Sequence, residues 1–478
     1  MKNELSVGSP SGLPFSYVQT LDDYERAIKQ LGENRARLAT DSETRNKPGF
    51  KQESARLNPH QGEIALLTLQ SDQSSPTVFD LVCLESEAFN PRPLVELMQR
   101  AEYLIAHNAK FDFGMILGYF GVLMQNCRCT LQLARLLSNA TGSKFGLMRG
   151  HTLADLCRDF LNVRMTGKGS LQRADWGIDS SRRRLDNPQW VEMLTYAAND
   201  TPHLFSLHDF LIESLCNPLP PTPLIQTTRA ENPGLGMSAV VEIEMALIPV
   251  IVEIEFNGLP VSRSVMNLFQ RAITKRKESL AVELCEEFRS QGLKNDPMGL
   301  WGDLVANPAS VKTLNNPTKM KQILSERLGA DLTSTQTKTL ERALDILKGF
   351  SNDEEDIELI NEQEEATYRD LEQLEDALLL QNADLVYQFL QYKKMLKTES
   401  MDLRPYINSV SGRIHSKYDA NRAATGRSNS SGPNAQQISG RTEVVVELEV
   451  DMTGDGAVIF PSDSKEVLND WLSNVIDN

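Results

Sequence analysis

The sequence is poor in the features that mark secreted, zinc-binding and membrane proteins. It holds six cysteines in 478 residues, with no CxxC pair and no zinc-type spacing; Cys127 and Cys129 form a lone CxC. No apolar run approaches the roughly 18 residues of a membrane-spanning helix. The opening residues, MKNELSVGSPSG, lack the apolar stretch of a signal peptide. We therefore expect a cytoplasmic protein with no membrane partner, whose thiols are reduced and mostly buried.

The chain also lacks an excess of positive charge. Its 49 Lys and Arg are outnumbered by 65 Asp and Glu, for a net charge of −16. Because nucleic-acid phosphates attract Lys and Arg locally, an enzyme of nucleic acids with this charge has to gather its basic groups in a few places. The charge argues against broad coating of DNA, but it is compatible with a deep anionic site that holds divalent metal ions. The length allows two or three domains.

Hydrophobic periodicity divides the chain at residues 217–236, which hold five prolines and show little periodicity. Before that segment, strands and helices are mixed, which predicts an α/β domain. After it, the pattern is nearly all helical. The predicted strands are 35–44, 63–70, 78–84 and 103–108, and the predicted helices are 21–32, 93–101, 110–120, 130–138, 151–161, 189–215, 238–256, 262–292, 318–329, 335–349 and 354–397. The predicted domains are a flexible N-terminus at 1–20, the α/β domain at 21–215, a linker at 216–236, a helical region at 237–440 and an acidic tail at 441–478.

Two acidic residues stand two apart at the end of the first predicted strand. Residues i and i+2 of a strand point to the same side, so Asp41 and Glu43 would present two carboxylates on one face. Alone, such a pair is also consistent with a solvated strand end.

Two further motifs place an acidic residue on a helix. Asn108, Lys110 and Asp112 follow the apolar run YLIA, where Asn108 is a good N-cap and Asp112 lies one helical turn later beside it. An Asp in a first turn is also favoured by the helix dipole alone. Tyr196 and Asp200 stand at i and i+4, and therefore share one helix face; an amphipathic helix with a Tyr at the edge of the core would look the same.

Together the three motifs resemble the DEDD exonuclease superfamily in its Tyr-containing branch, which includes the proofreading domains of DNA polymerases and ribonuclease D. The resemblance covers about residues 20–215 and includes HTLADLCRDFLNV (151–163), Lys168 and LQRADW (171–176). The family pattern has Asp where Cys129 stands. That position does not bind metal in the family, so the departure does not threaten activity.

The resemblance implies a ribonuclease H-like fold, with a mixed central sheet flanked by helices, and a site for two Mg²⁺ ions that Mn²⁺ can replace. Two-metal hydrolysis needs an anionic cradle of carboxylates, and Mg²⁺ prefers oxygen ligands. The resemblance implies that Asp41 bridges both ions, that Glu43 and Asp200 complete the coordination of the ion beside the nucleophile, and that Asp112 holds the second ion largely through water. It also implies that Tyr196 orients the attacking water. Asn108 and Lys110 would contact the substrate or neighbouring carboxylates.

The second half resembles the opening of the polymerase region in family-A DNA polymerases. Residues 240–262 read as a buried helix with a glycine C-cap at Gly258, and 319–344 resemble the segment leading into the thumb. In 408–438, Thr425, Gly426 and Arg427 begin a Ser-rich stretch that in the family contacts the primer–template minor groove. A Gly/Ser/Asn-rich loop without DNA contact is the alternative. Local basic residues favour phosphate contact: Lys393, Lys394, Lys397, Arg404, Arg413, Lys417, Arg422 and Arg427.

The resemblance stops after residue 440. No DYSQIELR-like palm strand, fingers helix or HDE-like motif is present. We interpret the chain as the N-terminal portion of a truncated or split family-A DNA polymerase. We expect it to act as a 3′-5′ exonuclease on single-stranded DNA 3′ ends or on primer–template duplex. The carboxylates would lie on one domain and the DNA-contacting segment on the other. Two alternatives are a subunit that docks a separately encoded palm and fingers chain, and a ribonuclease D-like RNA-processing exonuclease.

Overall fold

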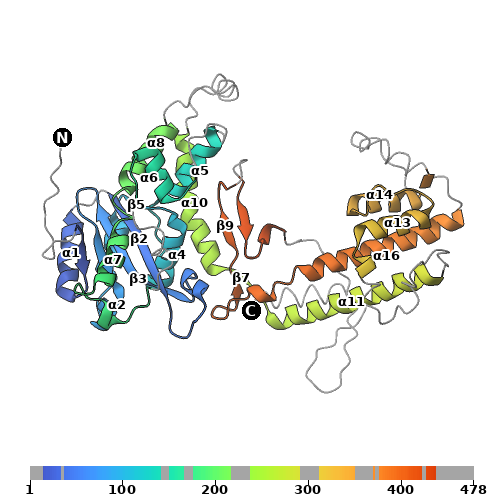
Figure 1. The fold of residues 1–478 in the computed structure, drawn as a ribbon, viewed down its shortest axis with the longest axis horizontal. Helices are drawn as coiled ribbons and strands as arrows, with labels where there is room; N and C mark the ends of the chain where they lie inside the picture. The colour runs from blue at the N-terminus through green and yellow to red at the C-terminus, as the bar shows by residue number, and fades with distance from the viewer. Residues whose placement is uncertain are drawn as a thin grey trace, which may run out of the picture. The chain divides into compact units, whose positions relative to one another are not determined.

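The computed structural model describes residues 14–33, 37–141, 150–165, 176–216, 237–290, 312–349, 370–371, 376–422 and 427–437. The described residues form two compact units, one built from 1–260 and 406–437 and the other from 261–405 (Figure 1). The predicted linker beyond Cys216, the acidic tail at 441–478, and Thr425 and Gly426 lie outside the described residues.

A mixed six-stranded sheet forms the centre of the first unit. Its strand order is β1-β4-β3-β2-β5-β6. The pairs β2–β3 and β3–β4 are antiparallel, whereas β1–β4, β2–β5 and β5–β6 are parallel. The predicted α/β class with a mixed sheet is confirmed. The strands are β1 (Ser16–Val18), β2 (Arg37–Asn46), β3 (Gly62–Ser71), β4 (Thr77–Asp80), β5 (Tyr103–Ala106) and β6 (Cys127–Cys129).

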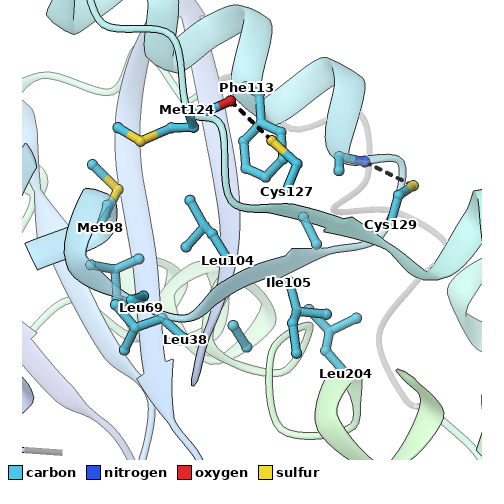
Figure 2. Packing of buried hydrophobic residues seen from close by; sticks show 14 of the residues in the cluster. Leu38, Leu69, Met98, Leu104, Ile105, Phe113, Met124, Cys127, Cys129 and Leu204 are labelled. Carbon is cyan, nitrogen blue, oxygen red and sulfur yellow. Dashed lines mark hydrogen bonds between the residues drawn. The ribbon is translucent and has the colours of Figure 1, made fainter. Parts of the chain in front are cut away.

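Helices bury both faces of this sheet. The larger core lies between the sheet and helices that include α4, α5 and α8, and Figure 2 shows Leu38, Leu104, Ile105 and Phe113 packed within it. The smaller core lies under α7, around Trp190. The helices of this domain are α1 (Leu21–Glu33), α2 (Leu81–Ser86), α3 (Arg92–Arg100), α4 (Ala109–Phe120), α5 (Thr130–Thr141), α6 (Leu153–Leu161), α7 (Pro188–Ala198) and α8 (Leu204–Cys216), with short 3-10 turns at Glu53–Leu57 and Ser180–Arg182.

Three local expectations differ from the structure. The predicted flexible N-terminus contains β1, because Phe15 and Val18 are buried in the cores and hold that strand against β4. The strand predicted at 78–84 ends at Asp80, whose carboxylate accepts a hydrogen bond from the Cys83 N–H and starts α2. The helix predicted at 189–215 is divided into α7 and α8.

The first unit also includes α10 (Ser238–Asn257), which corrects the predicted domain boundary. Its buried face, with Val241, Met245 and Ile248, belongs to the larger core and packs against α4, α5, α8 and β6. The predicted glycine C-cap is present, since Gly258 has φ +61° and its N–H bonds the Ile254 carbonyl. Burial of this apolar face explains why α10 stays with the α/β domain rather than with the helices that follow.

The segment 406–437 returns to the first unit. Within it, β8 (Arg413–Ile414) pairs with β7 (Leu259–Pro260), and β9 (Lys417–Asp419) pairs with β10 (Asn429–Ser431). This placement corrects the expectation that the carboxylates and the DNA-contacting segment lie on different domains. The physical reason is a set of polar contacts with α4, α5 and α10 that is described with the site.

The second unit is helical, as predicted. Its helices are α11 (Arg263–Ser290), α13 (Pro317–Leu328), α14 (Thr337–Leu347) and α16 (Asp376–Ser400). They enclose their own core, which includes Ile273, Leu340 and Phe389. Across both units, none of the helices that the structure describes has the length and apolarity needed to cross a membrane.

Candidate active site

Strand β2 presents Asp41 and Glu43 on the face that α7 covers. In the antiparallel register Asp41 is opposite Thr68, and Glu43 is opposite Leu66. The Thr68 hydroxyl donates to the Ala197 carbonyl of α7 at 3.3 Å. Because directly opposed residues share a face of the sheet, both carboxylates point to the side where α7 ends. Each is half-buried, whereas Ser42 between them is buried on the opposite face.

Asp112 closes the edge of the sheet beside these carboxylates. Strand β5 pairs with β2 only as far as Ala39, and α4 begins directly after β5. The buried carboxylate of Asp112 accepts hydrogen bonds from the Ser42 N–H at 2.9 Å and the Ser42 hydroxyl at 2.6 Å, both at Oδ1. Burial raises the pKa of Asp112, the bonds from Ser42 oppose that rise, and the nearby charge of Asp200 adds to it.

The start of α4 is held by Cys129 rather than by the side chain of Asn108. Asn108 occupies the N-cap position with left-handed backbone angles of φ 62° and ψ 41°, but its side chain makes no capping hydrogen bond. Instead the Ala109 N–H points at Cys129 Sγ, 3.4 Å away (Figure 2). Burial raises the pKa of the Cys129 thiol, so it is a neutral buried group. The cysteine at this position therefore supports the helix that carries Asp112.

Helix α7 and the turn after it supply Tyr196 and Asp200. Burial raises the pKa of the Tyr196 hydroxyl, and the charges of Asp200, Glu43 and Asp41 raise it further, in that order. The phenol thus lies in the combined field of three carboxylates and stays protonated at neutral pH. Its ring lies 6.2 Å from that of the buried Trp176.

Electrostatic effects place all four predicted carboxylates near one another. The charges of Asp41, Glu43 and Asp200 raise the pKa of Tyr196, and the charge of Asp200 raises the pKa of Asp112. As their side chains stand, no group of three or more His, Cys, Asp or Glu residues within the described ranges is placed to hold a metal ion. The donor set still fits divalent cations, because it is all carboxylate oxygen and its mutual repulsion is what a bound cation would relieve.

Lys110 makes polar contacts that join three segments of the first unit. Its ammonium group donates to Glu255 Oε1 and to the Tyr418 carbonyl, both at 2.7 Å, and lies 3.5 Å from Asp419 Oδ1. It therefore ties α4 to α10 and β9. On the neighbouring helix α5, Asn139 donates to the Asn421 carbonyl at 3.1 Å. These bonds hold 406–437 against the α/β domain.

Half of the eight predicted basic residues make side-chain polar contacts within the protein, and the eight residues are divided between the two units. Arg404 pairs with Asp402 at 2.8 Å in the second unit, and Arg422 pairs with Asp419 at 3.1 Å in the first. Lys393 donates to the Thr335 carbonyl. Arg413 bonds the Asn257 and Gly258 carbonyls at the end of α10, at 2.5 and 3.1 Å.

Arg427 differs from these residues. It is exposed at the start of the turn into β10, and it forms no ion pair with any residue in the described ranges. It stays the candidate for contact with DNA. Thr425 and Gly426, predicted beside it, cannot be placed because they fall outside those ranges.

Sequence reasoning missed a buried network behind α7. Arg183 pairs with Asp80 at 2.9 Å, and both side chains are fully buried. Arg183 also donates to the Ile178 and Trp176 carbonyls, at 2.9 and 2.5 Å, and Tyr17 donates to Asp80 at 2.7 Å. The network fixes the segment that bears Trp176, the ring neighbour of Tyr196. No short-range signal joins these residues in the sequence.

Residues 15–215 match the profile of the 3′-5′ exonuclease family. The first unit carries a 3′-5′ exonuclease domain of the family-A DNA polymerase type. The exonuclease match begins at residue 15, so it includes β1, which the predicted boundary at residue 21 excludes.

Curated relatives support the same likeness. The chain is 26% identical over 196 residues to DNA polymerase I of Caldicellulosiruptor bescii, which covers 41% of this chain and 18% of that protein. It is also 26% identical over 248 residues to DNA polymerase I of Pseudomonas aeruginosa, and this match covers 52% of this chain and 21% of that protein. The chain thus spans about a fifth of the length of these relatives. The predicted likeness to a family-A DNA polymerase is confirmed.

A solved structure extends the likeness beyond the exonuclease domain. The POL domain of Pol1 from M. smegmatis, in complex with DNA primer–template and dNTP, aligns with 90% of this chain and 56% of its own, with a TM-score of 0.53 and 14% identity. At that identity the alignment shows a shared fold.

Proposed function

We propose that this protein removes nucleotides from DNA 3′ ends by hydrolysis at the Asp41, Glu43, Asp112 and Asp200 site with two divalent cations, Mg²⁺ or Mn²⁺. The observation that carries the proposal is that the charges of Asp200, Glu43 and Asp41 all raise the pKa of the Tyr196 hydroxyl, and that the charge of Asp200 also raises the pKa of Asp112. Such a concentration of negative charge at the end of a sheet repels the phosphate backbone. It becomes useful to a nuclease when divalent cations bridge the carboxylates and the phosphate.

Each residue then has a defined task. Asp41, central on β2, would serve both cations. Glu43 and Asp200 would hold the cation on the side of the attacking water, and Asp112 would serve the other. Bound cations would supply a lower pKa for the attacking water and charge stabilisation for the leaving 3′ oxygen. Tyr196 orients that water through a hydrogen bond, and because it keeps its proton it is a positioning group and not a base.

Tyr196→Phe should slow hydrolysis about tenfold, the value of one lost hydrogen bond to a reacting group, without abolishing it. The carboxylates and their cations stay in place, so the dissociation constant for Mn²⁺ should not change. The turnover rate on single-stranded DNA at saturating Mg²⁺ checks this. A loss as severe as that of Asp41→Ala would show that Tyr196 does more than orient water.

The overall proposal is tested with end-labelled single strands of DNA and RNA that have the same sequence. Wild-type protein should shorten the DNA strand in Mg²⁺ or Mn²⁺ and should be inactive in EDTA. Degradation of RNA in clear preference to DNA would favour the ribonuclease D-like alternative instead. No shortening of either strand with any divalent cation would refute the proposal.

The 406–437 segment supports a second part of the proposal, a grip on primer–template duplex next to the exonuclease site. Arg427→Ala should weaken duplex binding for all sequences and lower the salt dependence by about one unit of slope, as expected for one phosphate contact. The Michaelis constant on duplex should rise, with little change on short single strands. A salt titration of duplex affinity measures both effects.

Arg92→Ala is the matched control for that titration. Arg92 is equally exposed, on α3, where it pairs only with Glu96 of its own helix. If Arg427→Ala and Arg92→Ala both keep the wild-type affinity and slope, 408–438 is a loop without DNA contact.

The chain alone should add no nucleotides to a primed template. Nucleotide addition requires its own two-metal carboxylate site, and the palm motifs that carry it are absent from this sequence. Primer extension with all four dNTPs, in protein that also carries Asp41→Ala to prevent trimming, measures this. Template-directed extension that co-purifies with the chain through several columns would contradict it.

A second candidate function, a subunit for a separately encoded palm and fingers chain, is favoured by the outward face of α10. Ile243, Val250 and Ile254 are exposed there at helical spacing. Such a partner should co-elute with wild-type protein in gel filtration and should dissociate from an Ile243→Asp, Val250→Asp variant. Equal co-elution with both proteins, or with neither, would remove this candidate.

A further inference from the structure

The edge of β2 beside Asp112 is built around one serine. Because β5 stops pairing with β2 at Ala39, the Ser42 N–H has no strand to bond on that side. Asp112 takes the place of the strand, because its Oδ1 accepts hydrogen bonds from the Ser42 N–H at 2.9 Å and from the Ser42 hydroxyl at 2.6 Å. All of these groups are buried. A buried carboxylate held by two donors from one residue has little freedom to change rotamer.

We propose that Ser42 is a positioning residue of the exonuclease site, whose hydroxyl fixes Asp112 so that Oδ2 is presented to a divalent cation. This inference rests on the proposed function. Both hydrogen bonds end on Oδ1, which leaves Oδ2 as the oxygen that can turn to a cation or its water. Outer partners of this kind orient metal-binding carboxylates, and their loss typically weakens metal binding about 10- to 100-fold.

Thr40 shows that a buried hydroxyl on β2 does not by itself imply this role. It lies two residues earlier, and therefore on the same face as Ser42, and it is equally buried. Its Oγ1 has no hydrogen-bond partner among the described residues. Thr40 is thus a matched control, because it lies on the same face of the same strand and is buried like Ser42, but its hydroxyl makes no hydrogen bond within the described residues.

The experiment is a calorimetric titration of full-length protein with Mn²⁺ alone. Asp112→Ala first defines which part of the Mn²⁺ binding depends on Asp112. Ser42→Ala should weaken that part about tenfold, since the backbone N–H of residue 42 still holds Asp112. Ser42→Thr, which keeps the hydroxyl, should bind Mn²⁺ within about twofold of wild type, and so should Thr40→Val.

Ser42→Thr and Ser42→Val have the same shape and differ only in the hydroxyl, so their comparison stands even if either change at this buried site lowers stability. Tighter Mn²⁺ binding by Ser42→Thr than by Ser42→Val supports the inference. Equal binding by the two, wild-type binding by Ser42→Ala, or an equal loss in Thr40→Val overturns it. If wild-type protein binds no Mn²⁺, the proposed function itself fails, and this result is distinct from the others.

Discussion

Asp41→Ala and Asp200→Ala should each abolish nuclease activity, with a loss of about a thousandfold or more in turnover. Asp41 lies on β2 and Asp200 follows α7, so the two residues come from opposite ends of the exonuclease domain's sequence. Both act on the Tyr196 hydroxyl, which places them around a common point. In the proposed mechanism all four carboxylates would hold the cations, so removing either one would take away a ligand that the other three do not replace. Turnover on labelled single-stranded DNA measures the loss.

The fold should survive both substitutions, because Asp41 is only half-buried and Asp200→Ala removes a buried charge without leaving a new one. Asp186→Ala is the matched control: Asp186 is an exposed acid that pairs with Arg184 on the surface, and its loss should leave turnover unchanged. Circular dichroism melting in EDTA checks the fold. Near-wild-type turnover in either Asp41→Ala or Asp200→Ala would show that the hydrolytic site lies elsewhere.

Breaking the Arg183–Asp80 pair should cost about 3–5 kcal/mol of unfolding free energy, among the largest losses that one substitution causes. Arg183→Met leaves the fully buried Asp80 carboxylate with hydrogen bonds from neutral groups, among them the Tyr17 hydroxyl and the Cys83 N–H. The charge has no counterion and no access to water. The same substitution also removes the donors that hold the Ile178 and Trp176 carbonyls.

Urea unfolding, followed by the fluorescence of Trp176 and Trp190 in a background with Trp301 and Trp471 replaced by Phe, measures this cost. Arg184→Met is the control one residue away, where the ion pair is exposed and should contribute less than about 1 kcal/mol. A double change, Arg183→Met with Asp80→Leu, should recover much of the loss, because it removes both buried charges. Equal stability of Arg183→Met and Arg184→Met would mean that the buried pair does not stabilise the domain.

Periodic patterns predicted the elements that carry the catalytic candidates. The strand with Asp41 and Glu43 and the helix with Asp112 depend on alternation and on an apolar run followed by a cap, which are local properties of the chain. The same reasoning could not separate β4 from α2. The seven residues VFDLVCL read as one apolar run, and the strand ends where the Cys83 N–H donates a capping hydrogen bond to the Asp80 carboxylate.

Long-range contacts account for what the sequence could not predict. The pattern predicted α10 as a buried helix, but it did not predict that its buried face packs against α4 and α8, because helical periodicity does not identify the partner. Lys110 is predicted to contact the substrate or neighbouring carboxylates, and the partners that the structure shows, Glu255 and the Tyr418 carbonyl, come from segments that are distant in the sequence. The bond from Ser42 to Asp112 joins residues 70 positions apart, so no local pattern predicts it.

The direct test of the central claim is the polarity and metal dependence of DNA degradation by the wild-type chain. A single strand with a 5′ label should shorten one nucleotide at a time in Mg²⁺, and the same strand with a blocked 3′ end should stay intact. Adding EDTA, or using Asp41→Ala, should stop the shortening. Internal cleavage of the blocked strand, release of the 5′ label in the first step, or undiminished degradation by Asp41→Ala would contradict a 3′-5′ exonuclease that depends on these carboxylates.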